Sequence, residues 1–284
     1  MSSVKAIIFG ATGAVGRAAV LEAQSRGAQV TLAMRNTKKP IPGFTPELEK
    51  KLSFTRVQAD LSDPKSVQRA VSESGATVAF SYILFEAEDG LLETHKAMKR
   101  VGITHAVLLS SCCVTENGGP KPSSEAAEIL SVVHGKAELA LAESGLAYTA
   151  IHLAYFSSNI QMLEDWEEVK LGQLELAHPD APFDYLAPED VGALADARVA
   201  ATPPSSIKEA NSDEHSEKLR SRGFPERMIK SAVEMLTYLG RDAAILYEPE
   251  TYRVASMNFR KYTGRQLTTF KAWVDKHREE LLAN

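Results

Sequence analysis

The sequence predicts an α/β fold in which a doubly wound parallel sheet is followed by a smaller, mostly helical C-terminal lobe. Two observations in the first 152 residues predict the sheet. Short apolar runs rich in β-branched residues alternate with longer helical patterns, as they do in βαβ units. Several of these runs are almost entirely apolar, which is typical of strands covered on both faces.

Each expected element has its own signal along the chain. The strands are Val4–Phe9, Gln29–Met34, Ser53–Val57, Thr77–Phe80, His105–Leu109 and Ala147–His152. The helices between them are Ala14–Arg26, Lys65–Ser74, Gly90–Val101 and Ser124–Ser144. Glycines follow four of the helical patterns shortly before a strand, where a left-handed C-cap favours this residue: Gly27, Gly75, Gly102 and Gly145.

The alternation loosens after residue 152. A helix is expected to begin near Pro188, and two more are expected over Pro225–Leu239 and Thr268–Leu282. Residues 202–222 are polar, opened by prolines and poor in large apolar side chains, so we expect a flexible surface loop. We therefore divide the chain into a first domain over residues 1–152 and a smaller lobe over residues 153–284, with interweaving of the two left open.

The composition excludes several classes of protein. The formal net charge of −5 argues against a basic nucleic-acid surface, and no apolar run reaches the roughly 20 residues that span a bilayer. The two cysteines, Cys112 and Cys113, are adjacent and cannot form a disulfide framework. The seven histidines show no ligand spacing, so no metal site is predicted. We expect a cytoplasmic protein without nucleic-acid or membrane partners.

A glycine-rich turn joins the first strand to the first helix. Gly10, Gly13 and Gly16 have the spacing G-x-x-G-x-x-G, and the same turn contains Thr12, Ala14 and Val15. Such glycines allow a sharp turn, a close approach of the backbone to a pyrophosphate, and tight packing of helix on strand. The helix N-terminus adds N–H groups and partial positive charge. In this strand–turn–helix context the motif predicts a dinucleotide-binding Rossmann domain, with a purely structural turn as the other interpretation.

The end of the second strand indicates which dinucleotide is bound. A site that prefers NAD usually carries an acid about 20 residues after the glycines. Here the strand is followed by Arg35, Asn36 and Lys39, with no acid. Because a guanidinium suits a dianionic 2′-phosphate, we expect NADP(H), and a solvated basic turn is the alternative.

The third strand leads to a second group of cofactor candidates. Asp60 and Leu61 stand where they can bracket the adenine ring, with Asp60 accepting a hydrogen bond from its amino group. Asp63 precedes Pro64 and is expected to cap the following helix.

These motifs together resemble the NmrA-like group of atypical short-chain dehydrogenase/reductases. The resemblance covers most of the chain: GATGAVGR, AMRNTKK, ADLSD, the helix of Lys136 leading into SGLAYTAIHLAYFSSN, then YLAPEDVGALAD and the tail NFRKYTGRQLTTFKAWVDKHREEL. Only the glycine and Lys136 blocks are specific on their own. The group includes NAD(P)H-dependent quinone and phenylpropanoid reductases, enzymes of fungal aromatic polyketide pathways, and regulators that bind NADP without turnover. The resemblance therefore implies fold and cofactor more strongly than activity.

Candidate catalytic residues stand at the strand ends, beyond which open α/β sheets bind their ligands. Ser111 occupies the position where the wider superfamily keeps a serine or threonine. The resemblance implies that Lys136 holds the nicotinamide ribose and stabilises an oxyanion, whereas an exposed helix lysine is the plain alternative. The tyrosine of the superfamily's Tyr-x-x-x-Lys dyad would fall at residue 132, which is Val132.

A replacement proton donor has several candidates. The phenols of Tyr82 and Tyr155 follow strand ends, although an ordinary structural hydrogen bond explains either one equally well. His134 lies two residues before Lys136 and therefore on another face of the helix. The cysteines after Ser111 are interpreted as small packed residues rather than reactive thiols.

The substrate is expected to lie beside an apolar, aromatic wall. Its candidate residues are Tyr82, Tyr155, Phe156, Asn159, Met162 and Trp166, which would suit a flat aromatic or quinone-like ligand but also a packed core. Two departures from the family pattern concern this region. His152-Leu153 stands where relatives commonly have Arg-Pro, and the stretch after Pro204 lacks the apolar strand found in many relatives.

The sequence thus predicts an NADPH-dependent reductase, in secondary metabolism, of a small aromatic, quinone or polyketide-derived carbonyl or conjugated alkene. An NADP-binding redox sensor that acts through a protein partner is the first alternative, because the usual tyrosine is missing. A non-redox dehydratase or isomerase on the same fold is the second. A monomer and a homodimer both fit the sequence.

Overall fold

The computed structural model describes residues 4–116, 129–154, 156–157, 173–176, 186–193, 206–209, 212–230, 233, 257, 259–261, 263–269, 272–273 and 275–277. The chain forms two compact units. The first comprises Met1–Leu153 with Val191–Ala195, and the second comprises Ala154–Asp190 with Asp196–Asn284.

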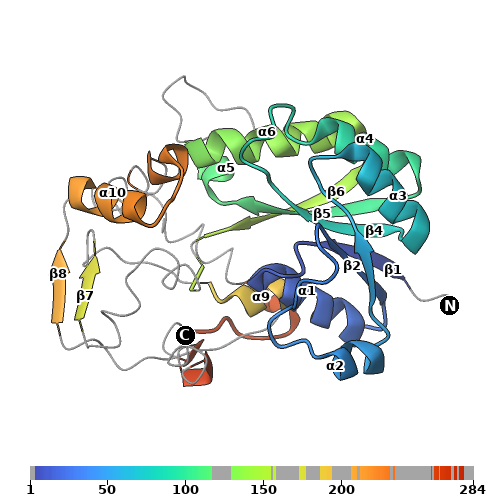
Figure 1. The fold of residues 1–284 in the computed structure, drawn as a ribbon, viewed down its shortest axis with the longest axis horizontal. Coiled ribbons are helices and arrows are strands. Elements are labelled where there is room, and N and C mark those ends of the chain that lie inside the picture. Colours follow the sequence, from blue (N-terminus) through green and yellow to red (C-terminus); the bar gives the residue numbers. More distant parts are fainter. Residues whose placement is uncertain are drawn as a thin grey trace. The chain divides into compact units, whose positions relative to one another are not determined.

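A six-stranded parallel sheet forms the centre of the first unit (Figure 1). Its strands are β1 (Lys5–Phe9), β2 (Gln29–Met34), β3 (Thr55–Gln58), β4 (Val78–Tyr82), β5 (His105–Ser111) and β6 (Ala147–Leu153). They lie in the order β3-β2-β1-β4-β5-β6. This order places the topological switch point between β1 and β4, where dinucleotides bind in doubly wound sheets.

Helices cover both faces of this sheet (Figure 1). They are α1 (Ala14–Ser25), α2 (Pro46–Lys51), α3 (Pro64–Ser74), α4 (Leu92–Arg100), α5 (Cys113–Glu116) and α6 (Ile129–Ser144). Ile7 and Phe9 of β1 pack into a core with α3, α4 and α6, while Ile8 packs on the other face with Val20 of α1. Alternate residues of one strand are thus buried on opposite faces, and the predicted doubly wound α/β class is confirmed.

The strand and helix bounds follow the sequence signals closely. Glycine ends the helices as expected: Gly75 caps α3 with φ 61°, and the other three predicted glycines also have positive φ. Two short helices, α2 and α5, are additions to the predicted set. The expected helix from Ser124 begins, within the described residues, at Ile129.

The second unit contains a parallel pair of strands, β7 (Gln173–Leu176) and β8 (Ser206–Glu209), and the helix α10 (Ser212–Ser221). The prediction of a loop over residues 202–222, without a strand after Pro204, was therefore wrong. The segment is polar, but Leu219 is buried against Ile229 and anchors the helix. Acidic residues in the first turn of α10 and basic residues in its last turn also favour the helix dipole.

The helix α9 (Pro188–Ala193) begins in the second unit, with Pro188 at its start as predicted. Its Asp190 is buried, and Oδ2 of this side chain accepts a hydrogen bond of 2.8 Å from the backbone N–H of Thr268. This contact connects two segments of the unit that are far apart in sequence. Helical residues also occur within the two predicted C-terminal helices, at 226–230 and at 272–277 where described.

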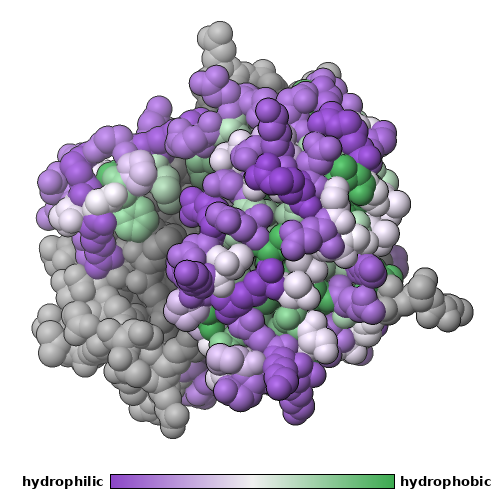
Figure 2. Space-filling model, turned by 45° about the vertical axis from the view of Figure 1, so that its right-hand side comes forward, coloured by the Kyte–Doolittle hydropathy of each residue, from purple (hydrophilic) through white to green (hydrophobic). Residues whose placement is uncertain are grey.

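The surface is largely hydrophilic on the face that Figure 2 shows, with apolar patches separated by polar side chains. The large apolar side chains exposed in the described residues are scattered along the chain: Val4, Leu21, Val132, Leu139 and Met257. Within the same residues, no helix combines the length and the apolar character needed to cross a bilayer.

Candidate functional site

The glycine turn forms a cradle at the carboxyl end of β1. Gly10 has φ 76°, and its carbonyl oxygen accepts a 2.9 Å hydrogen bond from Gly13 N–H. A Cβ on Gly16 would overlap the Gly10 carbonyl oxygen, so glycine is required for α1 to begin this close to β1. Thr12, Ala14 and Val15 lie in the same turn and first helical turn.

The N-terminus of α1 is open to an anion. Its N-cap residue is Gly13, no side chain caps the helix, and no acid lies in its first turn. The N–H groups of a helix start and its dipole attract phosphate. A pyrophosphate therefore fits the cradle in both shape and charge.

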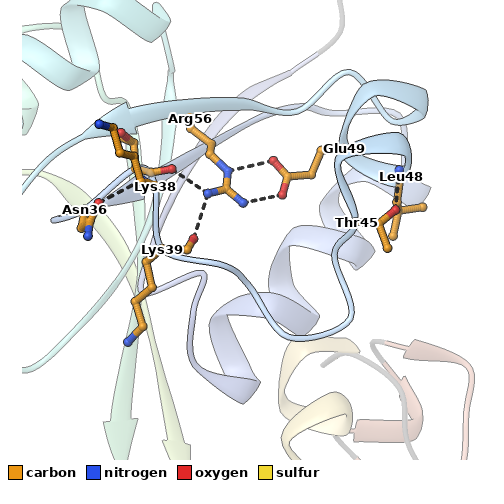
Figure 3. A network of polar contacts seen from close by, with 8 residues as sticks. Asn36, Lys38, Lys39, Thr45, Leu48, Glu49 and Arg56 are labelled. Carbon is orange, nitrogen blue, oxygen red and sulfur yellow. Dashed lines mark hydrogen bonds and ion pairs between the residues drawn. The ribbon is translucent and has the colours of Figure 1, made fainter.

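A basic loop follows β2, next to this cradle in the sheet. Arg35, Asn36 and Lys39 are exposed, and Oδ1 of Asn36 accepts a 2.9 Å hydrogen bond from the backbone N–H of Lys38 (Figure 3). The asparagine side chain thus shapes the turn, while the side chains of Arg35 and Lys39 extend from it.

Arg56 of β3 holds this loop in place (Figure 3). Its guanidinium donates to the backbone carbonyls of Thr37, at 2.6 Å, and Lys39, at 2.9 Å. The same group forms a fork with both carboxylate oxygens of Glu49 in α2, at 2.5 and 2.8 Å. Since both side chains are mostly buried, the pair is a rigid support rather than a mobile surface ion pair.

Asp60 lies at the carboxyl end of β3 and faces Arg35. Its Oδ1 accepts hydrogen bonds from the N–H of Ser62, at 2.9 Å, and from the Ser62 hydroxyl, at 2.8 Å. These bonds, with the charge of Arg35, hold the pKa of Asp60 below its ordinary value despite partial burial. The side chain is therefore an ionised acceptor.

The residues after Asp60 have structural roles in the free protein. Leu61 is buried, and its carbonyl oxygen accepts a 2.8 Å hydrogen bond from the Thr94 hydroxyl of α4. Asp63 caps α3 by accepting from the N–H of Lys65 at 2.9 Å, which confirms the predicted cap.

Tyr82, the last residue of β4, lies over the glycine cradle. A Cβ on Gly10 would approach Cε1 of the tyrosine ring to 2.8 Å. Burial raises the pKa of the phenol, the charge of Arg35 lowers it and that of Asp60 raises it. Tyr82 is thus grouped with the residues expected to bind the adenosine half of the cofactor.

Ser111 ends β5, two residues before the short helix α5 begins at Cys113. Its hydroxyl accepts a 3.3 Å hydrogen bond from the N–H of Cys113, and the N–H of Cys112 donates to the Leu153 carbonyl of β6 at 3.0 Å. Both cysteines are half-buried at this junction, and neither is part of a disulfide.

Lys136 is exposed on α6, and its side chain makes no hydrogen bond or ion pair with the described residues. It lies two positions before Glu138, which faces the sheet, so the two side chains leave the helix on different sides. The carbonyl of Lys136 packs against Gly90, where a Cβ would lie 2.6 Å from the oxygen.

A polar cluster occupies the carboxyl ends of β5 and β6. Ser110 and His152 are register partners, and both contact Oε1 of Glu138 on α6. The Ser110 hydroxyl donates at 2.5 Å and Nε2 of His152 lies at 2.8 Å. Glu138 is only 4% exposed. Burial raises the pKa of this carboxyl, but the bonds and charges of the cluster outweigh burial and the net shift is downward.

His134 lies one turn before Glu138 on α6 and completes the cluster. Burial lowers its pKa to about 4, against opposing attraction from Glu138. Its Nδ1 is buried with no hydrogen-bond partner among the described residues. The ring is therefore neutral at physiological pH.

Several predicted site residues cannot be placed. Tyr155, Asn159, Met162 and Trp166 lie outside the described residues. Phe156 is half-exposed and forms an isolated parallel bridge with Leu186 in the second unit. Among the residues that the structure describes, no three His, Cys, Asp or Glu side chains gather as metal ligands would.

The predicted site residues do not all lie together in the structure. Gly10, Arg35, Asp60 and Tyr82 come together around the cradle, whereas the Ser111 hydroxyl is bonded to the N–H of Cys113 and not to Lys136. Sequence reasoning missed Ser110 and Glu138. The i, i+4 spacing of His134 and Glu138 places both on one helix face, and this was the available signal.

Comparisons with known proteins agree with this geometry. Residues 10–173 match the family of NAD(P)H-binding domains. The nitrogen metabolite regulation-like protein bik4 of Gibberella fujikuroi is 27% identical over 96% of this chain and 96% of its own.

Two solved structures share the fold. NmrA, a negative transcriptional regulator, matches with a TM-score of 0.67 and 18% identity over 99% of this chain and 97% of its own. The NADPH-dependent quinone oxidoreductase of Escherichia coli matches with a TM-score of 0.66 and 18% identity over 97% and 100% of the two chains.

Proposed function

Because the chain belongs to the NAD(P)H-binding family, in which its fold and sequence are NmrA-like, we propose that it is an NADPH-dependent oxidoreductase. Its substrate is a small aromatic, quinone or polyketide-derived carbonyl or conjugated alkene, reduced by hydride transfer. The observation that carries the proposal is the polar cluster of Ser110, His134, Glu138 and His152. Such a cluster at the carboxyl strand ends lies where this kind of sheet performs its chemistry.

The preference for NADPH rests on the basic loop after β2. Arg35 is exposed there, with Asp60 close enough to interact with it, and Arg56 and Glu49 hold the loop from below. A guanidinium recognises a phosphate dianion through paired, charge-assisted hydrogen bonds. No acid that would accept from a ribose 2′-hydroxyl follows β2 in the sequence.

Each part of the site has a separate task in this proposal. The cradle of Gly10, Gly13 and Gly16 binds the pyrophosphate, and Asp60 accepts from the adenine amino group. The bound reduced nicotinamide supplies hydride. The side chains of residues 153–284 that were predicted to line the substrate site, Tyr155, Phe156, Asn159, Met162 and Trp166, would select a flat ligand.

A regulatory protein that binds NADP without turnover is the second candidate. It is favoured by Val132, which is 38% exposed at the position where the superfamily's dyad has its tyrosine. The similarity to a transcriptional regulator and to a regulation-like protein agrees with this candidate but also with the first.

A single-turnover experiment separates the two candidates. The protein is loaded with stoichiometric NADPH, mixed with a panel of quinones, aromatic ketones and enones, and followed at the absorbance of the reduced nicotinamide. We expect consumption with at least one acceptor. Tight binding without consumption across the whole panel would support the regulator instead.

A further inference from the structure

The reduction needs a proton source that the usual tyrosine does not supply. When hydride adds to a carbonyl, quinone or enone, negative charge develops on the substrate oxygen and must be neutralised by a proton. The helix position of the superfamily's tyrosine is Val132, which has no proton to give. A side chain that replaces it would stand at the carboxyl strand ends, where ligands of such sheets bind.

We propose that His152 is this proton donor and that Glu138 and Ser110 position it. This inference rests on the proposed function and assigns a catalytic residue to it. His152 is the penultimate residue of β6, and its side chain is 35% exposed, whereas that of Glu138 is 5% exposed. A substrate beyond the strand ends can thus reach the ring but not the carboxylate.

Glu138 gives His152 the properties that a proton donor requires. The carboxylate is ionised and buried, and its Oε1 lies 2.8 Å from Nε2 of the ring. A buried carboxylate in this position fixes the orientation of an imidazole. Ser110 donates to the same oxygen from the neighbouring strand and so fixes the carboxylate in turn.

The other members of the cluster and its surroundings are less suited to the role. His134 is neutral, with its pKa lowered to about 4 by burial. Ser110 is 4% exposed and its hydroxyl is directed at Glu138. Among the described residues, the titratable groups of the cluster that interact with His152 are Glu138 and His134, both from α6, and of these two only the carboxylate carries charge.

The proton balance of the step is simple. In the proposed step the His152 ring, oriented by its bond to Glu138, gives a proton to the substrate oxygen as the hydride adds to the substrate carbon. The neutral ring then regains a proton from water. The substrate thus gains one hydride and one proton, and His152 returns to its starting state.

The test compares His152→Ala with His105→Ala, measuring NADPH affinity by fluorescence titration and single-turnover rate with a reducible quinone. His105 begins β5 and bonds Thr149 of β6 at 3.0 Å, so it is a histidine in the same strand pair at the opposite end. We expect His152→Ala to slow turnover by about 100-fold or more while NADPH affinity stays within a few-fold. Added imidazole restores part of the rate. His105→Ala keeps the parent rate.

Two further measurements address positioning. Glu138→Gln keeps the size of the side chain but removes its charge, so turnover should fall and imidazole should not restore it. In the protein without cofactor, the Nε2 proton of His152 should give a ring ¹⁵N–¹H NMR signal that shifts upfield in Glu138→Gln, because a neutral amide is a weaker acceptor.

The possible outcomes separate the role of His152 from the proposed reductase function. Parent activity retained in His152→Ala overturns the role of His152 and leaves the reductase intact. If His152→Ala loses both turnover and NADPH affinity, and imidazole does not restore turnover, His152 supports the cofactor site instead. Its role as proton donor is then overturned, and the reductase function is left intact. A parent protein that binds NADPH but reduces no acceptor overturns both.

Discussion

Arg35 is the residue on which cofactor choice depends in our interpretation. Its side chain is exposed after β2 and interacts with Asp60, at the position where an NAD-preferring site would carry an acid. Replacing it with an acid both removes a phosphate ligand and adds a repulsive charge.

We predict that Arg35→Asp weakens NADPH binding about 10- to 100-fold, because a charge-assisted hydrogen bond contributes roughly 1.5–3 kcal/mol. NADH, which lacks the 2′-phosphate, should lose only a few-fold. Calorimetric titration with both nucleotides checks this. Lys50→Asp makes the same charge change on exposed α2 and should leave both affinities unchanged. Equal losses for the two nucleotides in Arg35→Asp would contradict the phosphate assignment.

Some contacts of the site residues could be predicted from the sequence, and others could not. The glycine cradle and Asp63 follow from local rules of turn and cap chemistry, so their geometry was predictable. The contact of Ser110 and His152 with Glu138 depends on strand register and on the rotation of α6 over the sheet. Strand register and helix rotation are set by tertiary packing and cannot be read from a single sequence. The sequence therefore indicated Ser111 and Lys136 instead of Ser110 and Glu138.

At the scale of elements, the β1–α1 junction makes two different demands on its glycines. A Cβ on Gly16 would overlap the backbone of Gly10, whereas a Cβ on Gly13 would lie at 3.4 Å from the nearest atom, the Gly10 carbonyl oxygen. Gly16 thus serves the packing of α1 on β1, and Gly13 keeps the N-terminus of α1 open to phosphate.

The two substitutions should therefore separate stability from binding. Gly16→Ala forces α1 away from β1, and we expect a loss of about 2 kcal/mol or more in the free energy of unfolding, as for other overpacked sites. Gly13→Ala should keep the stability within about 1 kcal/mol but weaken NADPH binding. Urea denaturation and fluorescence titration measure the two effects. A Gly16→Ala protein as stable as the parent would contradict the packing role.

The loop after β2 depends on a second element, the Arg56–Glu49 fork. Arg56→Lys keeps the charge but cannot reproduce the bonds to both Glu49 oxygens and to two carbonyls. We expect NADPH affinity to fall several-fold while NADH affinity changes less, since the loop that presents Arg35 is loosened. Lys50→Met, on the exposed side of α2, is the matched control. Parent-like NADPH binding in Arg56→Lys would show that the fork does not support the site.

The wrong prediction of a loop over residues 202–222 has a physical reason at the same scale. A single buried leucine, Leu219, and a favourable charge distribution suffice for α10 once Ile229 provides a surface to pack on. Periodicity cannot reveal an apolar face made of one residue. Most of the first unit was predictable because its sheet and its longer helices carry many core positions, whereas α2, which buries no residue, was missed.

At the scale of the whole molecule, the buried His95 and the half-buried His134 make stability depend on pH. His95 is fully buried on α4, and neither ring nitrogen has a hydrogen-bond partner among the described residues. Burial lowers the pKa of His95, like that of His134, to about 4. The unfolded chain therefore binds more protons than the native state below the ordinary histidine value of about 6.5, and stability falls as the pH drops from there towards 4.

We expect each of the two histidines to cost about 2 kcal/mol of stability between pH 7 and pH 5. His95→Leu, of similar volume and without a titrating group, should remove one of these contributions and flatten the dependence measured by urea unfolding. Because His95 lies outside the proposed site, NADPH binding at pH 7 should not change. If the free energy of unfolding of His95→Leu depends on pH as steeply as that of the parent, His95 does not contribute to the pH dependence, and its assignment as a neutral buried histidine is contradicted.

The most direct measurement follows the fate of the hydrogen at C4 of the nicotinamide. NADPH deuterated at C4, in each of its two stereochemical forms, is given to the protein with a quinone or enone acceptor, and the product is analysed by mass spectrometry and NMR. An oxidoreductase of the proposed kind should transfer deuterium from one of the two forms only, with NADP⁺ formed in equal amount. Tight NADPH binding with no deuterium in any product and no NADP⁺ formed would contradict hydride transfer.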